Sequence, residues 1–280
     1  MPAWREYLTR KLLNIFLFLW YTAANLFIFT LAFNLDPQVP PKYGYGLGKQ
    51  TYLTPSPWIF GVLFLIHLLF AGTILYTQWT EKGNEIVIEE LGLQFPLLLA
   101  LSTLWAGTWA RQLPIPSFIL ALLVCLVSSN IFLRLKRGHP LAADSEWQEQ
   151  LFIHIPFSLY HGWTVFILVV NGFTAFGPTW FHSGHVAKFF AIWLLATLCG
   201  VSVAYAVATK GGDITGAGVI MLGLFAIWSE SHHYQPKWMY WATLVFAIIS
   251  LGAVVKSAVG TWQVWRGGEI RLDEVGGQSV

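Results

Sequence analysis

Long apolar runs dominate this chain, and each is close in length to the thickness of a lipid bilayer. A bilayer core requires about 20 apolar residues at the rise of an α-helix. Eight runs approach or exceed this length, and they are Leu12–Phe33, Pro57–Trp79, Leu91–Ala110, Ser117–Leu133, Leu151–Ala175, Phe189–Ala208, Ile214–Ser229 and Trp238–Val259. Apolar residues follow one another in these runs instead of alternating with polar ones, which favours helices over a β-barrel. The sequence therefore predicts an all-α, polytopic membrane bundle of eight transmembrane helices.

Composition argues against the other classes of protein. Charged residues make up 11% of the chain, whereas about 25% is usual in soluble proteins. The net charge is +2 and no basic stripe is long enough to follow a phosphate backbone, so no nucleic-acid partner is expected. Cys125 and Cys199 lie within apolar runs, which predicts neither a disulfide framework nor a zinc site. The sequence contains no recognised catalytic motif, so no catalytic residue is predicted.

The distribution of basic residues predicts how the bundle lies in the membrane. With the N-terminus inside, the inner segments carry ten basic residues and the outer segments carry five. Basic residues accumulate on the cytoplasmic side of membrane proteins. Because an even number of spans returns the chain to the side on which it started, both termini are expected to be cytoplasmic. The sequence does not identify which membrane holds the protein.

Two polar segments lie outside the apolar runs. The first outer loop, Asn34–Ser56, is rich in proline and glycine, and it is either a lid over the outer mouth of the bundle or a plain connector. The last segment, 266–280, is polar, and we expect it to form a disordered cytoplasmic tail.

Tryptophan is the second unusual feature, with 15 residues in the chain. Most of them lie near the ends of the apolar runs, where indole rings anchor helices at the membrane surface. Trp20, Trp105 and Trp163 instead lie near the middle of the first, third and fifth runs. An indole N–H at that depth requires a partner. These three side chains are therefore expected either to pack between helices or to line a pocket for a flat, apolar ligand.

Three blocks of sequence carry a resemblance to a known family. The first is LTPSPWIFG, from Leu53 to Gly61, followed by Gly72; the second is Trp105 in the third run. The third is PFSLYHGWTVFILVVN, in which Trp163 precedes Asn171 by eight residues. In these blocks and in their order, the chain resembles the TspO/MBR family of tryptophan-rich sensory proteins, whose animal members are called translocator proteins.

The resemblance covers residues 1–176 and implies a five-helix unit whose hydrophobic cavity binds tetrapyrroles or sterol-like ligands. It implies no settled catalytic activity. Residues 177–265 lie outside it and are interpreted as a three-helix membrane extension. The chain departs from the family pattern at Ser56 within the proline-rich block, at Ser102 in place of Asn, and at Phe64 in place of Trp. The identity of the ligand is therefore not carried over.

Polar side chains within the apolar runs are costly in a bilayer and are candidates for function. His67 lies near the centre of the second run, where it either makes one interhelical hydrogen bond or contacts a ligand, including as an axial ligand of haem iron. His154, Ser158 and His161 share one face of the fifth run. A proton path through His161 would make the protein a transporter. Asn171 is either a contact between helices or a pocket residue.

The leading hypothesis is an integral membrane protein that binds a flat hydrophobic ligand, a tetrapyrrole or a sterol-like molecule, in a sensory or regulatory role. The candidate ligand-binding residues are Trp58, His67, Ser102, Trp105, His161, Trp163 and Asn171. The alternatives are a small-molecule or proton-coupled transporter and an intramembrane enzyme, although the paired carboxylates or metal cluster of such an enzyme are not found. A tetrapyrrole is the one cofactor that the resemblance suggests. The expected partners are the lipid bilayer and a hydrophobic small molecule, and a homodimer is left open.

Overall fold

The computed structural model describes residues 3–32, 49–138, 147–179, 184–207, 212–231 and 235–276, and these are helical apart from short connections. The long helices are α1 (Ala3–Ala32), α2 (Gly61–Trp79), α4 (Gln94–Ala110), α5 (Pro114–Gly138), α7 (Ile155–Phe176), α8 (His185–Val207), α9 (Ile214–Ser231) and α10 (Lys237–Gly276). The short ones are η1 (Pro57–Phe60), α3 (Glu81–Asn84), η2 (Glu85–Glu90), α6 (Trp147–Glu149) and η3 (Gln150–His154). The predicted all-α fold is confirmed.

The number of membrane spans agrees with the sequence except at one bend. Among the described residues, seven helical segments are long and apolar enough to cross a membrane. The eighth candidate is a pair of segments, Glu81–Glu90 and Gln94–Ala110, which meet at an angle of 69°. The third predicted span therefore begins at Gln94, because Gly92 between the two segments has a φ of +54°, which ends regular helix.

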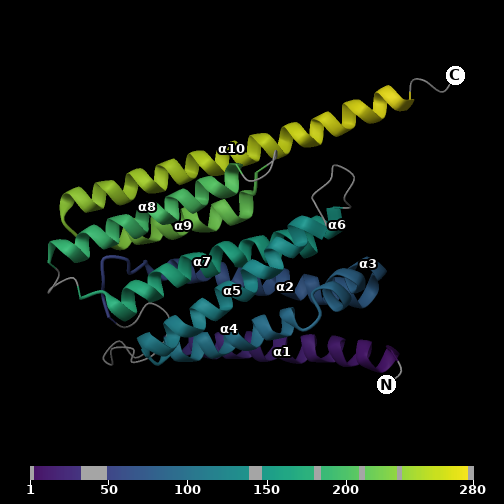
Figure 1. The fold of residues 1–280 in the computed structure, drawn as a ribbon, viewed down its shortest axis with the longest axis horizontal. Helices are drawn as coiled ribbons and strands as arrows, with labels where there is room; N and C mark the ends of the chain where they lie inside the picture. Colours follow the sequence, from purple (N-terminus) through teal and green to yellow (C-terminus); the bar gives the residue numbers. More distant parts are fainter. Residues whose placement is uncertain are drawn as a thin grey trace.

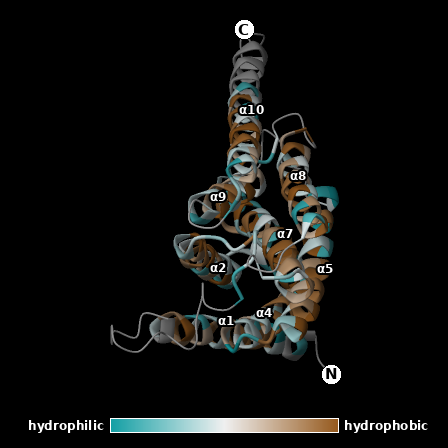
Figure 2. Ribbon diagram, turned by 90° about the vertical axis from the view of Figure 1, so that its left-hand side faces the viewer, coloured by the Kyte–Doolittle hydropathy of each residue, from teal (hydrophilic) through white to brown (hydrophobic). Residues whose placement is uncertain are grey.

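The helices form one elongated bundle with α1 along one side and α10 along the other (Figure 1). Helix α1 packs against α2 and α4, α4 packs against α5, and α8, α9 and α10 pack together. Helix α7 lies between these groups, in contact with α2, α5 and α9, as the end-on view in Figure 2 shows. Accordingly, 72% of the apolar window of α7 is buried, against 28% for α1 and for α10. Residues of α7 are therefore the best placed to form an interior site.

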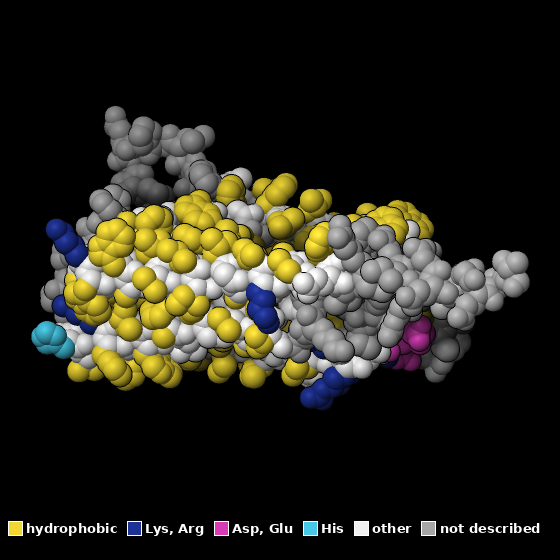
Figure 3. Space-filling view, turned by 90° about the horizontal axis from the view of Figure 1, so that it is seen from above, with side chains coloured by type: hydrophobic (Ala, Val, Ile, Leu, Met, Phe, Trp, Pro, Cys, Tyr) yellow, Lys and Arg dark blue, Asp and Glu magenta, His cyan; other side chains and the backbone are white. Residues whose placement is uncertain are grey.

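The outer faces of α8 and α10 are apolar, and Figure 3 shows hydrophobic side chains spread over this side of the molecule. Large exposed side chains on these two helices include Phe189, Trp193, Trp241, Ile248 and Val255. An exposed apolar surface of this extent is typical of contact with lipid. The protein is therefore an integral membrane protein whose helices contact the bilayer.

The two ends of the chain lie at the same end of the bundle, where α1 begins and α10 finishes (Figure 1). This arrangement fits an even number of spans; the assignment of that end to the cytoplasm stays a prediction. The expected disordered tail is wrong in one respect, because α10 continues to Gly276. Extending an established helix costs far less than starting one, so polar residues can prolong it. Most of the predicted lid loop, residues 34–48, lies outside the described residues.

Candidate functional site

The start of α7 is set by Pro156, near its first turn. Proline lacks an N–H, and its ring displaces the carbonyl four residues earlier, which here belongs to Phe152. The preceding turn, η3, is a π-helix, and Thr73 of α2 donates its hydroxyl to the freed Phe152 carbonyl over 2.6 Å. The Phe152 ring lies so close to α2 that a Cβ on Gly72 would be 2.6 Å from it. Proline and glycine thus fix how closely α7 approaches α2.

Trp105, Ser117 and Asn171 form a buried hydrogen-bonded group that joins α4, α5 and α7. The Asn171 side-chain oxygen accepts from Trp105 Nε1 over 3.3 Å and from Ser117 Oγ over 2.5 Å. Its amide nitrogen donates to the Ile167 carbonyl over 2.8 Å. All three side chains are buried. The structure therefore brings together two predicted site residues, Trp105 and Asn171, through a direct contact.

Ser102 lies one turn before Trp105 on α4 and is also buried. Its hydroxyl donates to the Leu98 carbonyl and accepts from the Tyr160 hydroxyl of α7, each over 2.5 Å. The Tyr160 ring packs against Phe70 at a centroid distance of 5.2 Å. Phe70 in turn packs with Phe95 and Phe157, and the centroids of these three rings are 5.3 to 5.6 Å apart. Aromatic side chains therefore occupy the space between α2, α4 and α7 at this depth.

Trp163 is 1% exposed and lies on the side of α7 that faces η1. Trp163 and Phe60 pack edge to face, with their ring centroids 5.8 Å apart. Phe166, on the next turn of α7, is 5.9 Å away. Trp105 and Trp163 both face protein, in agreement with the interpretation of their positions along the chain.

A cavity of about 150 Å³ lies at the end of the bundle where α4 finishes and α5 begins. Its walls include Lys49, Thr54, Phe60, Trp109, Gln112 and Val170. The Trp109 ring stacks on Trp105 at 6.3 Å, and Phe60 contacts Trp163, so aromatic side chains continue from this cavity into the interior. Trp109 Nε1 is buried and has no hydrogen-bond partner within the described ranges. We refer to this space as the outer cavity.

Lys49 closes one side of the outer cavity. Its ammonium group donates to the Thr174 carbonyl over 3.3 Å and to the Gly177 carbonyl. These carbonyls lie at the C-terminus of α7, where unpaired oxygens and the helix dipole favour a cation. The segment that leads from Lys49 to η1 is thereby tied to the end of α7.

A second hollow, of about 560 Å³, lies between the end of α7 and the start of α8. Its walls are apolar and include Gly172, Phe173, Phe176, Val186, Phe190 and Leu194. None of the predicted site residues is among its lining residues. We refer to it as the side groove.

Two predicted site residues, Trp58 and His67, lie away from the Trp105–Asn171 contact. Trp58 is half-exposed and donates its indole N–H to Ser229 of α9 over 3.3 Å. His67 stacks on Tyr21 of α1 at 4.4 Å, and its Nδ1 lies 2.5 Å from the Leu63 carbonyl. Trp20 was expected to face protein, but it is 58% exposed, since α1 contacts neighbours on only one side.

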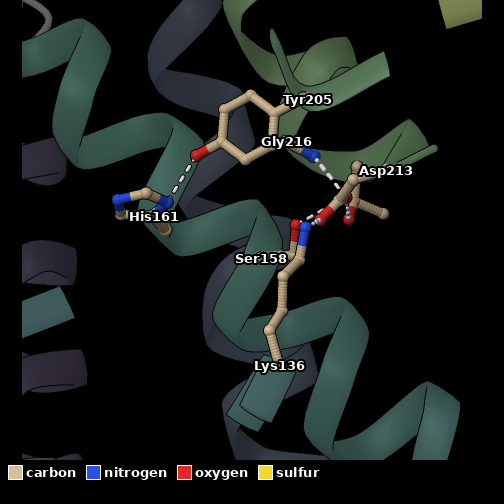
Figure 4. Close-up of polar contacts among 7 residues, drawn as sticks. Lys136, Ser158, His161, Tyr205, Asp213 and Gly216 are labelled. Atoms are coloured by element: carbon tan, nitrogen blue, oxygen red, sulfur yellow. Dashed lines mark hydrogen bonds and ion pairs between the residues drawn. The ribbon is translucent and has the colours of Figure 1, made fainter. Parts of the chain in front are cut away.

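His161 belongs to a different polar group, on the side of α7 that faces α5, α8 and α9 (Figure 4). Its Nε2 is 2.9 Å from Ser129 Oγ, and its Nδ1 is 2.5 Å from the Tyr205 hydroxyl. Nearby, Ser158 donates to Asp213 over 2.6 Å, and Asp213 is 3.5 Å from the Lys136 ammonium group. The seven predicted residues thus do not form one pocket.

Sequence reasoning missed Trp109, Tyr205 and Asp213. Trp109 was interpreted as an anchor at the membrane surface because it lies near the end of a run. Tyr205 had no distinguishing motif within its run. Asp213 did carry a local signal, because an Asp ahead of a helix caps its N-terminus, and here it accepts from the backbone N–H of Gly216 over 3.1 Å.

Comparison with known proteins adds a family match. A family model described as TSPO-like protein matches residues 11–255. The matched region continues through α8 and α9 and ends within the first half of α10, beyond the blocks that carry the resemblance seen in the sequence. Neither the curated proteins nor the solved structures contain a match to this chain.

Proposed function

Because the chain belongs to the TSPO-like protein family, we propose that it is a membrane receptor for a flat hydrophobic ligand, a tetrapyrrole or a sterol-like molecule. The proposal places the ligand between the outer cavity and the Trp105–Asn171 contact. The ring of Trp109 would form the first wall that the ligand meets, and Trp105 and Trp163 would lie deeper. A sensory or regulatory role follows if binding of the ligand changes how the helices pack.

The observation that carries this proposal is the continuous aromatic path from the outer cavity inward. Trp109 stacks on Trp105, whose N–H is held by Asn171, so the orientation of the Trp105 ring is fixed before any ligand arrives. Preformed pockets of this kind combine apolar walls with a few polar groups that orient the ligand. The buried, unpaired N–H of Trp109 is one such group in this path.

The size of the outer cavity requires that binding be accompanied by opening. Its volume is about 150 Å³, whereas pockets for drug-sized ligands measure about 300–1,000 Å³. Lys49 is the part of the cavity wall that can move with least loss of packing, since two hydrogen bonds tie it to α7, whereas Tyr52 and Leu53 after it are buried. We infer that the ligand enters as the Lys49 side chain releases the end of α7.

Porphyrin absorbance tests the proposal without interference from the 15 tryptophans. Full-length protein in phosphatidylcholine nanodiscs is titrated with protoporphyrin IX, and the Soret band is recorded against empty nanodiscs. We expect a saturable shift with one site per chain, and competition by a sterol if the two ligand classes share the pocket. Trp109→Ala should weaken binding about fivefold, since loss of a stacked aromatic partner costs about 1 kcal/mol.

Trp241→Ala is the matched control, because this indole is exposed on the outer face of α10. It should bind porphyrin with the affinity of the unmodified chain. The proposal is rejected if protein-containing and empty nanodiscs give the same titration, or if Trp241→Ala weakens binding as much as Trp109→Ala.

A further inference from the structure

The group around His161 is separate from the proposed ligand site and includes the charged pair Asp213–Lys136. Tyr205 is buried, and the side chains of Asp213 and Lys136 are only 11% and 24% exposed. Ionisable side chains within membrane spans are rare and mark paths for protons or ions. From the geometry of this group, we propose that His161 is a reversible proton-binding site that couples protonation to the packing of α8 and α9 on α7.

The first argument is that both ring nitrogens of His161 meet hydroxyl groups, those of Ser129 and Tyr205. A hydroxyl can donate or accept, whereas a neutral imidazole offers one donor and one acceptor and its cation offers two donors. When a proton binds, the hydroxyl that had donated to that nitrogen rotates and accepts instead. The ring can therefore gain or lose a proton while both hydrogen bonds are kept.

His67 shows the contrasting arrangement in the same protein. Its Nδ1 faces the carbonyl oxygen of Leu63, which can only accept, so that nitrogen carries a proton permanently. His67 stacks on Tyr21 through its ring face, and no hydroxyl group of the described segments bonds to its Nε2. His67 therefore lacks the paired hydroxyls that would let it exchange a proton while its contacts are retained.

The second argument is the charge around His161. The charged groups that act on it are Asp213, ahead of α9, and Lys136 of α5. Tyr205 of α8 contacts it directly, and Cys125 of α5 lies beyond it, near Tyr205. Burial of the ring is the largest influence and disfavours its cation, the Asp213 carboxylate favours the cation, and the Lys136 ammonium group opposes it. Lys136 is the more exposed of the pair and has a long, flexible side chain, so it can turn toward water. The carboxylate then remains to balance the imidazolium.

The third argument is the close packing that links this site to the last three helices. The Tyr205 ring lies against Gly216, where a Cβ would be 2.5 Å from the ring. Gly162, next to His161, approaches α9 so closely that a Cβ there would be 2.8 Å from the Gly216 carbonyl. A change in the hydrogen bond between His161 and Tyr205 therefore acts directly on the contact between α7, α8 and α9.

The test is ¹⁵N NMR of full-length protein labelled at histidine, in nanodiscs of phosphatidylcholine and phosphatidylglycerol, between pH 4 and pH 9. The His161 signal is identified by its loss in His161→Gln. We expect it to move reversibly between the neutral and cationic forms. Tyr205→Phe, which keeps the ring against Gly216, should alter the Nδ1 signal, and Asp213→Asn should leave less of His161 protonated at a given pH.

The coupling is measured by amide hydrogen exchange in α8 and α9 at the two ends of that pH range. Each rate is expressed as a protection factor, which removes the intrinsic dependence of amide exchange on pH. We expect protection to change with pH in the unmodified protein and much less in His161→Gln; if that variant does not fold, Tyr205→Phe serves in its place. If the His161 signal stays in one neutral form while the protein remains folded, the proposal that His161 binds a proton is rejected. Protection factors in α8 and α9 that are independent of pH overturn the coupling. Neither result bears on porphyrin binding, because the two sites share no residue.

Discussion

Asn171 is the residue at which the buried polar contacts of α4, α5 and α7 meet. In Asn171→Ala, Trp105 Nε1 and Ser117 Oγ both lose their acceptor. Interhelical hydrogen bonds in membranes are worth about 1 kcal/mol, and unpaired buried donors add to the loss. We expect the free energy of unfolding in nanodiscs to fall by about 1–2 kcal/mol, measured by thermal melts followed by circular dichroism. Asn130→Ala, at an exposed position of α5, should change it by less than about 0.5 kcal/mol; equal losses would show that Asn171 has no special role.

Substitution of Lys49 is expected to change the rate at which the ligand binds. Lys49→Met removes the donor that ties the segment before η1 to the Thr174 and Gly177 carbonyls. Because release of Lys49 from these carbonyls is proposed to admit the ligand, stopped-flow absorbance should show porphyrin association several-fold faster than in the unmodified chain. Lys237→Met, at the exposed start of α10, should associate at the unmodified rate. A slower rate in Lys49→Met would mean that the lysine instead attracts the ligand.

At the scale of elements, glycine contacts determine how α9 docks on α7. In Gly162→Ala the new Cβ would lie 2.5 Å from Val219 and 2.8 Å from the Gly216 carbonyl, so the two helices must separate. Overpacking of this kind costs about 1–3 kcal/mol, and the same thermal melts measure it. Gly218→Ala on α9 meets no atom within 4 Å, and its higher helix propensity should leave stability equal or raised. A Gly162→Ala variant as stable as Gly218→Ala contradicts this packing.

The elements themselves were predictable because length and continuous apolarity are local properties of the sequence. The bend before α4 was not predicted, since the signal is a single glycine with positive φ, Gly92. Trp105 and Asn171 were found through family spacing, yet their contact spans 66 residues and becomes visible only when α4 and α7 are placed. The Tyr205 partner of His161 is 44 residues distant for the same reason. The expectation that Trp20 faces protein is wrong because the inward face of α1 depends on which helices cover it.

For the whole molecule, the topology depends on whether the bent pair of segments, Glu81–Glu90 and Gln94–Ala110, crosses the membrane. If α4 crosses the membrane, eight crossings place the start of α1 and the end of α10 on the same side, as Figure 1 suggests. Single cysteines at Glu6, Arg111 and Gln263, in a chain whose two native cysteines are replaced, test this with an impermeant maleimide on intact vesicles. We expect positions 6 and 263 to be labelled from one side and position 111 from the other. Labelling of positions 6 and 263 from opposite sides would leave only seven crossings.

The most direct test of the ligand site is to map where a bound ligand touches the chain. A photoreactive porphyrin or sterol is added to the full-length protein in nanodiscs, activated by light, and its attachment sites are read by peptide mass spectrometry. We predict modified peptides from α4 and α7 around Trp105 and Trp163, reduced by excess protoporphyrin IX. Modification confined to the side groove, at Phe173 and Phe190, or spread over the outer face of α10 would contradict an interior site.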